Sequence, residues 1–392
     1  MMNSAVASKG ITVTMRNCKS AALGTQFPVR NEPVMIRLVQ AARYLPRARA
    51  SAALALVIVL ALPLAFQQPV IYAQEPLTVT PRPAPTKTPQ PTATSVQGDG
   101  VLTEEAPPSD AVRSLTQADL SVLTGNVQRP NGIVWFDGKL YATCTGDWTI
   151  YELDATTGAT QAYIYGVRNS HTLFAERDAS NELVLWIPDF QTNELLRVTR
   201  NGVQNAASNL NGPWGIAYLD EDAFLVTNLR ANTVSRVRRD GQMTDVVTGL
   251  VSPTGIARDE DTIYVANNGS TRRSIEWYDV RAAAGDAVET TDATSVSQSL
   301  VTGLQNTTGL TMGADGNLYF AYSLGTRGVV GRVDPQQCRE NGGCTADQVE
   351  IVVLTELAAP IAGLTLTPDM RLYLHTMFSP DIYWVQLEGG AA

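Results

Sequence analysis

The sequence predicts an all-β protein, a six-bladed β-propeller, and two observations carry this prediction. First, one phrase recurs six times: a turn, usually a Gly followed by an aliphatic residue, and then a Leu-Tyr or Ile-Tyr strand. Second, the copies begin 40, 43, 40, 54 and 54 residues apart, close to the roughly 40–50 residues of one four-stranded blade. The copies are Asn131-Gly132-Ile133, His171-Thr172-Leu173, Trp214-Gly215-Ile216, Thr254-Gly255-Ile256, Thr308-Gly309-Leu310 and Ala362-Gly363-Leu364.

Within one unit, alternation and turn residues place the strands. In the fourth unit we expect three strands at residues 255–258, 263–266 and 274–279. A further strand precedes each glycine phrase, and these outer strands are expected at residues 119–123, 161–165, 203–207, 244–248, 297–302 and 349–355.

The last blade lacks an outer strand of its own, because the chain ends soon after a third strand at residues 382–387. We therefore expect the strand at about 119–123 to complete it. Such closure leaves no open sheet edge in the ring. The propeller is predicted over residues 113–392, with six blades.

A leader precedes the ring, at residues 1–73. An apolar run at residues 52–66 follows Arg37, Arg43, Arg47 and Arg49, and its length suits the apolar region of a signal peptide better than a full membrane span. Met35 offers a compact start for such a peptide. Cleavage near Ala73 and an uncleaved membrane anchor both remain open; in either case we expect the ring outside the cytoplasmic membrane, secreted or anchored.

Residues 74–112 form a second segment, rich in Pro and Thr, such as Thr80-Pro81-Arg82-Pro83. It has too few apolar residues to offset the entropy lost on ordering, and its prolines favour extended conformations. We expect a disordered stalk.

Charge argues against nucleic acid as a partner. The chain has 29 basic and 38 acidic residues, but its first 50 residues hold eight of the basic ones and a single acid. The remainder is therefore strongly acidic and repels phosphate backbones and anionic headgroups. A membrane contact is expected only through the leader, and the ring is expected to be a monomer.

The cysteines agree with export. Cys338 and Cys344 frame a turn-rich insertion, where a disulfide, two free thiols or a metal site are the alternatives. Two thiolates alone do not complete a zinc site, and an oxidising compartment favours the disulfide. Cys144, within a predicted strand, is expected to be a small buried residue.

The blade phrase Gly-Ile/Leu-x-x-x-Asp-x-x-Leu/Ile-Tyr-Val, followed by strands such as residues 231–241, resembles the NHL repeat. It is also similar to the wider six-bladed group of gluconolactonase (senescence marker protein)-like enzymes, strictosidine-synthase-like proteins and virginiamycin B lyase. The resemblance covers roughly residues 115–390. It is specific for architecture and not for activity, because one propeller fold hosts unrelated functions.

The resemblance to gluconolactonase-like enzymes implies a divalent cation at the top of the central tunnel, held by Glu, Asn and Asp side chains, some of them just before the blade Gly. None of the six residues at this pre-glycine position is a carboxylate here. Asn131 replaces the acid of the family's first-blade pattern, Glu-Gly-Pro-Val-Trp. Ca²⁺ and Mg²⁺ sites draw affinity from ligand charge, and a water bound here would lack an adjacent base. We therefore expect no cofactor. The alternative is a divergent Ca²⁺ or Mg²⁺ site that uses Asn131, Asn228 and Asn267.

A second set of residues follows the second strand of each blade, where NHL-like repeats often carry Asp. Together with the pre-glycine positions it predicts a polar, partly aromatic tunnel mouth made of Asn131, His171, Asp189, Trp214, Asn228, Thr254, Asn267, Thr308 and Tyr322. The alternative is that the Asn side chains cap backbone groups at strand ends. His171 is the one candidate general base, whereas His375 is expected to pack between blades.

Two functions remain open. The first is a non-catalytic extracellular ring on a stalk, which binds a protein, peptide, glycan or small molecule. The second is a divergent metal-dependent hydrolase, lactonase or lyase that uses Ca²⁺ or Mg²⁺. The missing carboxylates favour the first, and no nucleophile elbow or Cys/His pair supports covalent catalysis. The sequence does not identify the ligand.

Overall fold

The structure, a computed structural model, describes residues 114–269, 274–283, 289–295, 298–358, 360–376 and 379–388. These residues belong to the second of two compact units in the chain, Thr103–Ala392. The predicted leader and stalk, residues 1–73 and 74–112, lie outside the described residues and stay predictions.

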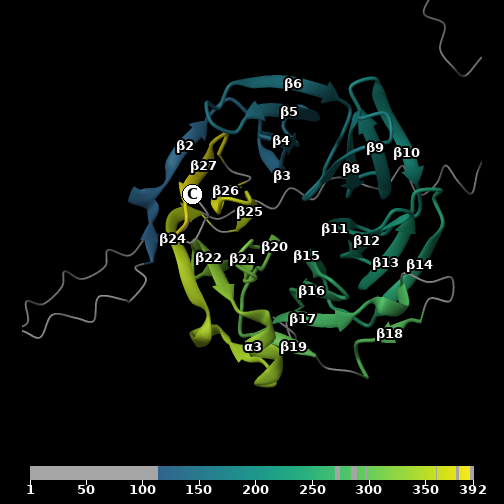
Figure 1. Cartoon of the computed structure of the whole chain (residues 1–392), viewed down its shortest axis with the longest axis vertical. Helices are drawn as coiled ribbons and strands as arrows, with labels where there is room; N and C mark the ends of the chain where they lie inside the picture. The colour runs from purple at the N-terminus through teal and green to yellow at the C-terminus, as the bar shows by residue number, and fades with distance from the viewer. Residues whose placement is uncertain are drawn as a thin grey trace, which may run out of the picture. The chain divides into compact units, whose positions relative to one another are not determined.

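Six sheets follow one another around a ring (Figure 1), as predicted. Each is built on four antiparallel strands, and we number the blades in chain order of their inner strands. From inner to outer strand, blades 1 to 3 consist of β3 (Pro130–Phe136), β4 (Lys139–Cys144), β5 (Thr149–Asp154) and β6 (Thr160–Tyr165); β7 (Phe174–Arg177), β8 (Leu183–Asp189), β9 (Glu194–Thr199) and β10 (Gly202–Ala207); and β11 (Pro213–Asp220), β12 (Ala223–Asn228), β13 (Thr233–Arg238) and β14 (Met243–Thr248).

The remaining three blades follow the same order. They consist of β15 (Pro253–Asp259), β16 (Thr262–Asn267), β17 (Ser274–Asp279) and β19 (Ser299–Thr302); β20 (Leu310–Met312), β21 (Leu318–Leu324), β22 (Arg327–Val333) and β24 (Glu350–Ala358); and β25 (Ile361–Leu366), β26 (Arg371–Thr376), β27 (Ile382–Gln386) and β2 (Ser121–Thr124).

The ring is closed by β2, the outer strand of blade 6. It pairs antiparallel with β27, and Ser121 lies opposite Trp384. The last blade thus combines strands from both ends of the propeller sequence, which confirms the predicted closure. Backbone pairing across this seam occupies an edge that would otherwise be free to pair with another chain.

Three blades carry a fifth, two-residue strand that the sequence did not predict. These strands run parallel to the outer strands β24, β14 and β19, and they are β1 (Leu115–Thr116), β18 (Thr291–Asp292) and β23 (Cys344–Thr345), respectively. Each comes shortly before the outer strand of the next blade. Each therefore ties one blade to its neighbour through backbone hydrogen bonds.

The core consists of six apolar clusters, one at each boundary between neighbouring blades. Successive side chains of a strand point to opposite faces of the sheet, and both faces of a blade are covered. The strands therefore read as continuous apolar runs. In β16, for example, Ile263, Tyr264, Val265 and Ala266 are all buried.

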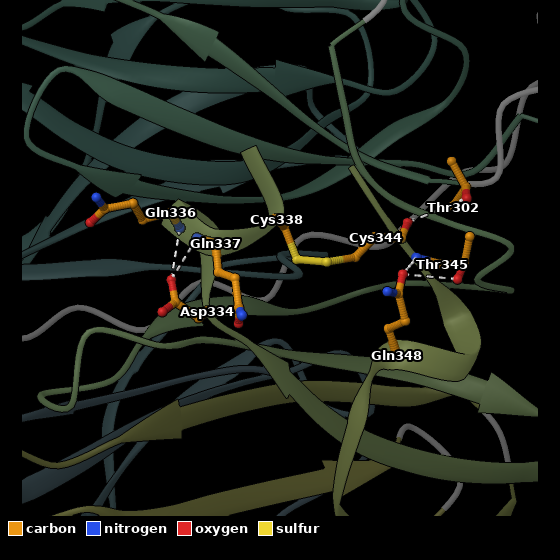
Figure 2. The surroundings of a disulfide bond; sticks show 8 residues. All are labelled: Thr302, Asp334, Gln336, Gln337, Cys338, Cys344, Thr345 and Gln348. Atoms are coloured by element: carbon orange, nitrogen blue, oxygen red, sulfur yellow. Dashed lines mark hydrogen bonds between the residues drawn. A yellow bond between two sulfur atoms is a disulfide. The ribbon is translucent and has the colours of Figure 1, made fainter. Parts of the chain in front are cut away.

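A disulfide joins Cys338 to Cys344, as predicted (Figure 2). Cys338 lies in the short helix α3 (Pro335–Glu340), whose first backbone N–H groups donate to Asp334. Cys344 begins β23, and its carbonyl accepts a hydrogen bond from the Thr302 hydroxyl of β19. The bond thus holds a strand that links blades 4 and 5.

Among the residues that the structure describes, none of the helices is long and apolar enough to span a bilayer.

Candidate functional site

The central tunnel is walled by the inner strands. It contains a cavity of about 470 Å³, to which every blade contributes the aliphatic residue that follows the blade Gly or its Thr172 counterpart. These residues are Ile133, Leu173, Ile216, Ile256, Leu310 and Leu364. Further along the inner strands the lining becomes polar, with Tyr218, Arg258 and Glu260. The cavity therefore lies downstream of the pre-glycine positions and not among them.

The inner strands approach one another closely at the pre-glycine positions. A Cβ on Gly255 would lie 2.4 Å from the Thr308 carbonyl oxygen, so only glycine fits there. The hydroxyls of Thr254 and Thr308 donate to the carbonyls of Thr307 and Ile361. These two predicted lining residues therefore bind neighbouring backbone, and both are buried.

The polar residues that end the second strands cap loops. Asp189 accepts from the backbone N–H groups of Arg168 and Asn169, at 2.8 and 3.4 Å. Asn228 and Asn267 accept in the same way, from Asn211 at 3.2 Å and from Val251 at 2.8 Å. In each case the loop leads into the inner strand of the same blade, which is the capping role that the sequence left open.

Tyr322 differs from its expected place at the tunnel mouth. In blade 5 it holds the register position that Asn267 holds in blade 4, but its ring packs in the apolar cluster between blades 4 and 5. Cys144, the equivalent residue of blade 1, is likewise buried in a cluster. The physical reason is that the side chains of a strand point to the two faces of its sheet, and both faces of a blade are covered by neighbouring blades.

Three aromatic residues gather at the start of the inner strands of blades 2 and 3. The His171 imidazole stacks on the Trp214 indole with ring centroids 3.3 Å apart and an angle of 4° between the planes. Phe190 meets both rings edge-on, and the Arg230 guanidinium lies 4.2 Å from the Phe190 ring centroid. The predicted residues His171 and Trp214 are thus in direct contact.

Beside this stack lies a pocket of about 270 Å³ between blades 1 and 2, hereafter the blade 1–2 pocket. Its lining combines buried polar residues with exposed basic and aromatic ones: Arg129, Asn131, Thr145, Trp148, Arg168, Asn169, His171 and Gln191. Asn131 and His171 are buried and form the floor, whereas both arginines and Trp148 are exposed at the rim. Two predicted site residues, Asn131 and His171, therefore meet here.

The floor of the pocket holds polar atoms without partners in the described part of the chain. The Asn131 amide nitrogen donates to Asn169 Oδ1 at 2.7 Å, which leaves Asn131 Oδ1 with no hydrogen bond. His171 Nδ1 is buried and unpartnered too, as is Nε1 of Trp214, which stacks on His171 but does not line the pocket. Burial lowers the pKa of His171 to about 3, since desolvation disfavours the imidazolium. His171 is therefore neutral near pH 7.

Two acids near these loops, Asp147 and Asp189, form no ion pair with the rim arginines among the described residues. Asp147 accepts from the Tyr151 hydroxyl at 2.5 Å and the Thr149 N–H at 3.3 Å. Asp189 is fully buried and, besides the two bonds above, accepts from the N–H groups of Gln191 and Thr192. Neither carboxylate lines the pocket.

The rim arginines were missed by the sequence analysis, although a signal was present. Of the six loops that lead into an inner strand, only those of blades 1 and 2 contain an Arg, at Arg129 and Arg168. The loops are irregular, so periodicity did not draw attention to them. Their positions become adjacent only because blades 1 and 2 are neighbours in the ring.

The residues at hand do not fit a hard divalent cation. Asn228 and Asn267 use their Oδ1 atoms to cap backbone N–H groups, so of the three amides predicted as ligands only Asn131 keeps a free oxygen. Across the described ranges, no three His, Cys, Asp or Glu side chains cluster in a way that could hold a metal. Neutral amide oxygens alone bind Ca²⁺ or Mg²⁺ weakly.

No protein-family model matches the sequence, and no curated protein matches it. Solved structures do match. A gluconolactonase from Xanthomonas campestris is 16% identical, over 68% of this chain and 89% of that one, with a TM-score of 0.50. A structural-genomics target assigned to the gluconolactonases is 14% identical, over 69% and 92%, with a TM-score of 0.51.

The chain has the gluconolactonase-like six-bladed fold. Virginiamycin B lyase from Staphylococcus aureus is also matched, at 17% identity over 66% of this chain and 81% of that one, with a TM-score of 0.39. Identities this low show the fold alone. The predicted architectural resemblance is confirmed, and the activity must be argued from the site.

Proposed function

We propose that this protein is a ligand-binding β-propeller that holds a small polar molecule in the blade 1–2 pocket without transforming it. One observation carries the proposal. The floor of the pocket presents buried, unpartnered polar atoms, Asn131 Oδ1 and His171 Nδ1, to a hollow of about 270 Å³. Buried polar groups without partners are costly and rare, so a ligand that supplies those partners would be bound well.

The same geometry favours binding over catalysis. His171 has a pKa of about 3 and accepts a proton poorly near neutral pH, where an effective general base has a pKa close to the working pH. Asp189, which caps the loop that carries Arg168 and Asn169, is occupied by four backbone N–H groups. The pocket thus offers recognition groups, and its residues lack a well-tuned base.

The proposal includes display outside the cytoplasmic membrane. The leader and the Pro/Thr-rich stalk would export the ring and hold it away from the surface. The disulfide between Cys338 and Cys344 supports this location, because such bonds persist mainly in oxidising compartments.

The test is a binding and turnover screen on the full-length chain. Polar metabolites, glycans, peptides, lactones and esters are tested by thermal shift and calorimetry, with and without millimolar Ca²⁺ or Mg²⁺, and the products are followed by mass spectrometry. We expect at least one small molecule to bind unchanged and without a cation. Asn131→Ala should weaken that binding about tenfold or more, as expected for a buried hydrogen bond.

Asn201→Ala is the matched control, because Asn201 is an exposed amide paired with Glu182 in a turn of blade 2. It should bind like the unmodified chain. Cation-dependent hydrolysis of a lactone or ester would overturn the proposal in favour of a metal-dependent hydrolase. Capture of a protein alone, unaffected by Asn131→Ala, would contradict the assignment of the pocket.

A further inference from the structure

We propose that the ligand of the blade 1–2 pocket is a small organic acid with a hydrogen-bond donor next to its carboxylate, such as an α-hydroxy acid. This inference rests on the proposed function and specifies its ligand class. Three features of the pocket support it: the two arginines at its rim, the aromatic platform beside one of them, and the unpartnered acceptor on its floor.

Six of the fifteen arginines in the described ranges form no ion pair with Asp or Glu among those residues, and the two at the pocket rim, Arg129 and Arg168, are among the six. Both line the same pocket. In a strongly acidic ring, two adjacent unpaired guanidinium groups make a local site for an anion, because their N–H groups match the geometry of a carboxylate.

Trp148 gives the rim an apolar platform. Its side chain is 51% exposed, and the Arg168 guanidinium lies 5.4 Å from its ring centroid. Its backbone φ is +59°, a left-handed conformation that bulky residues rarely adopt. Asn193 and Asn232 hold the same conformation directly before the third strands of blades 2 and 3, so the turn is shared and the indole is particular to blade 1, where its face can contact the organic body of a ligand.

The floor requires a donor from the ligand. Asn131 donates its amide N–H to Asn169 Oδ1, so its unpartnered atom is the oxygen, which only accepts. A fully ionised phosphate would place another acceptor against it. A neutral sugar could donate to it and accept from the arginines, but it lacks the charge that makes hydrogen bonds to a guanidinium strong. An acid that also carries a hydroxyl or amide N–H satisfies both ends of the pocket, whose 270 Å³ restricts the ligand to a small molecule.

The test compares four probes on the full-length protein by titration calorimetry: mandelate, phenylacetate, mandelamide and inorganic phosphate. Mandelate carries the carboxylate, the hydroxyl and a ring. Phenylacetate lacks the hydroxyl, and mandelamide lacks the charge. We expect one mandelate enantiomer to bind at least tenfold more tightly than each of the other three.

Two variants locate the site. Arg168→Gln and Arg129→Gln should each weaken mandelate binding about tenfold or more and leave the weak mandelamide binding unchanged. Arg281→Gln makes the same charge change at an exposed position of blade 4, where Arg281 pairs with Asp279. This control should bind mandelate like the unmodified chain, and melting curves of all three variants verify that they fold.

The outcomes separate this inference from the proposed function. Equal binding of mandelate and mandelamide, or binding that ignores both arginine variants, overturns the acid class. Equal binding of mandelate, phenylacetate and phosphate shows a plain anion site and overturns the need for a donor. If only neutral molecules from the wider screen bind, in a way sensitive to Asn131→Ala, the proposed function stands and the acid class is wrong. If nothing binds in a way sensitive to Asn131→Ala, both fail.

Discussion

The two histidines of the chain are both buried inside the ring. His375 is fully buried in β26, packed against Gly363, and His171 lies in the aromatic stack. Desolvation lowers the pKa of His375 to about 4 and that of His171 to about 3. In the unfolded chain a histidine titrates near 6.5. Folding therefore keeps both imidazoles neutral in a pH range where the unfolded chain binds protons.

This difference predicts a pH-dependent stability. Because the folded pKa values are depressed, the unfolded state binds more protons between about pH 6.5 and 4 and stability falls as the pH is lowered through that range. At pH 5 each histidine should cost about 2 kcal/mol relative to pH 8. Urea unfolding at both pH values measures it, with His375→Leu as the variant that should lose about 2 kcal/mol less on acidification. An equal loss in both proteins would show that His375 is not kept neutral by the fold.

Single residues also show where sequence reasoning stops. The pre-glycine residues could be aligned from the repeated phrase, and the structure brings Asn131, His171 and Trp214 to one region. For the residues that follow the second strands, the repeated phrase did not tell which way each side chain points. Tyr322 packs toward blade 4, whereas Ala321 beside it in β21 packs toward blade 6, and a shift of one residue in the pairing register would exchange the two faces.

At the scale of elements, alternation and turn signals predicted the six outer strands, the three other strands of blade 4 and the third strand of blade 6 by their ranges. The two-residue strands β1, β18 and β23 are too short for any period. They pair with the outer strand of the preceding blade, so their existence depends on the ring geometry. The sequence does contain a local signal for the ends of β1 and β23: Thr116 and Thr345 each begin a capping box with the residue three positions later.

The disulfide makes one of these short strands testable. Cys338→Ser with Cys344→Ser opens a small loop and should destabilise the ring by about 2 kcal/mol, chiefly by freeing the unfolded chain. Urea unfolding measures this loss. Hydrogen exchange should show faster exchange in β19 and β23 and unchanged rates in β6 and β10. A reducing agent should affect the unmodified chain in the same way and leave the double variant as it is; an unchanged midpoint in both would contradict a stabilising role.

For the whole molecule, the architecture follows from repetition, because six copies of one phrase at blade spacing leave few alternatives to a ring. The blade 1–2 pocket does not follow from it. Its basic rim combines Arg129 and Arg168, 39 positions apart, and only the packing of two blades makes them one surface. Repeats predict what the blades share, whereas this pocket consists of residues in which two blades differ from the other four.

Ring closure gives a last prediction at this scale. The backbone pairing of β2 with β27 joins the two ends of the ring. The register of this pairing shifts between Val122 and Thr124, so we replace both Val122 and Leu123 by Pro, which removes both N–H donors at the shift and disfavours the pairing. We expect a loss of about 1–3 kcal/mol, the cost of leaving a carbonyl of β27 without its donor, measured by thermal or urea unfolding.

The matched control is Val122→Ala with Leu123→Ala, which truncates the same side chains and keeps both N–H groups. Val122 is 56% exposed, so most of the control's smaller loss should come from Leu123, which packs partly against the cluster between blades 6 and 1. Because every blade borders two others, opening the seam should lower the unfolding midpoint of the entire ring in one transition. If the proline and alanine variants unfold alike, the side chains and not the backbone pairing close the ring.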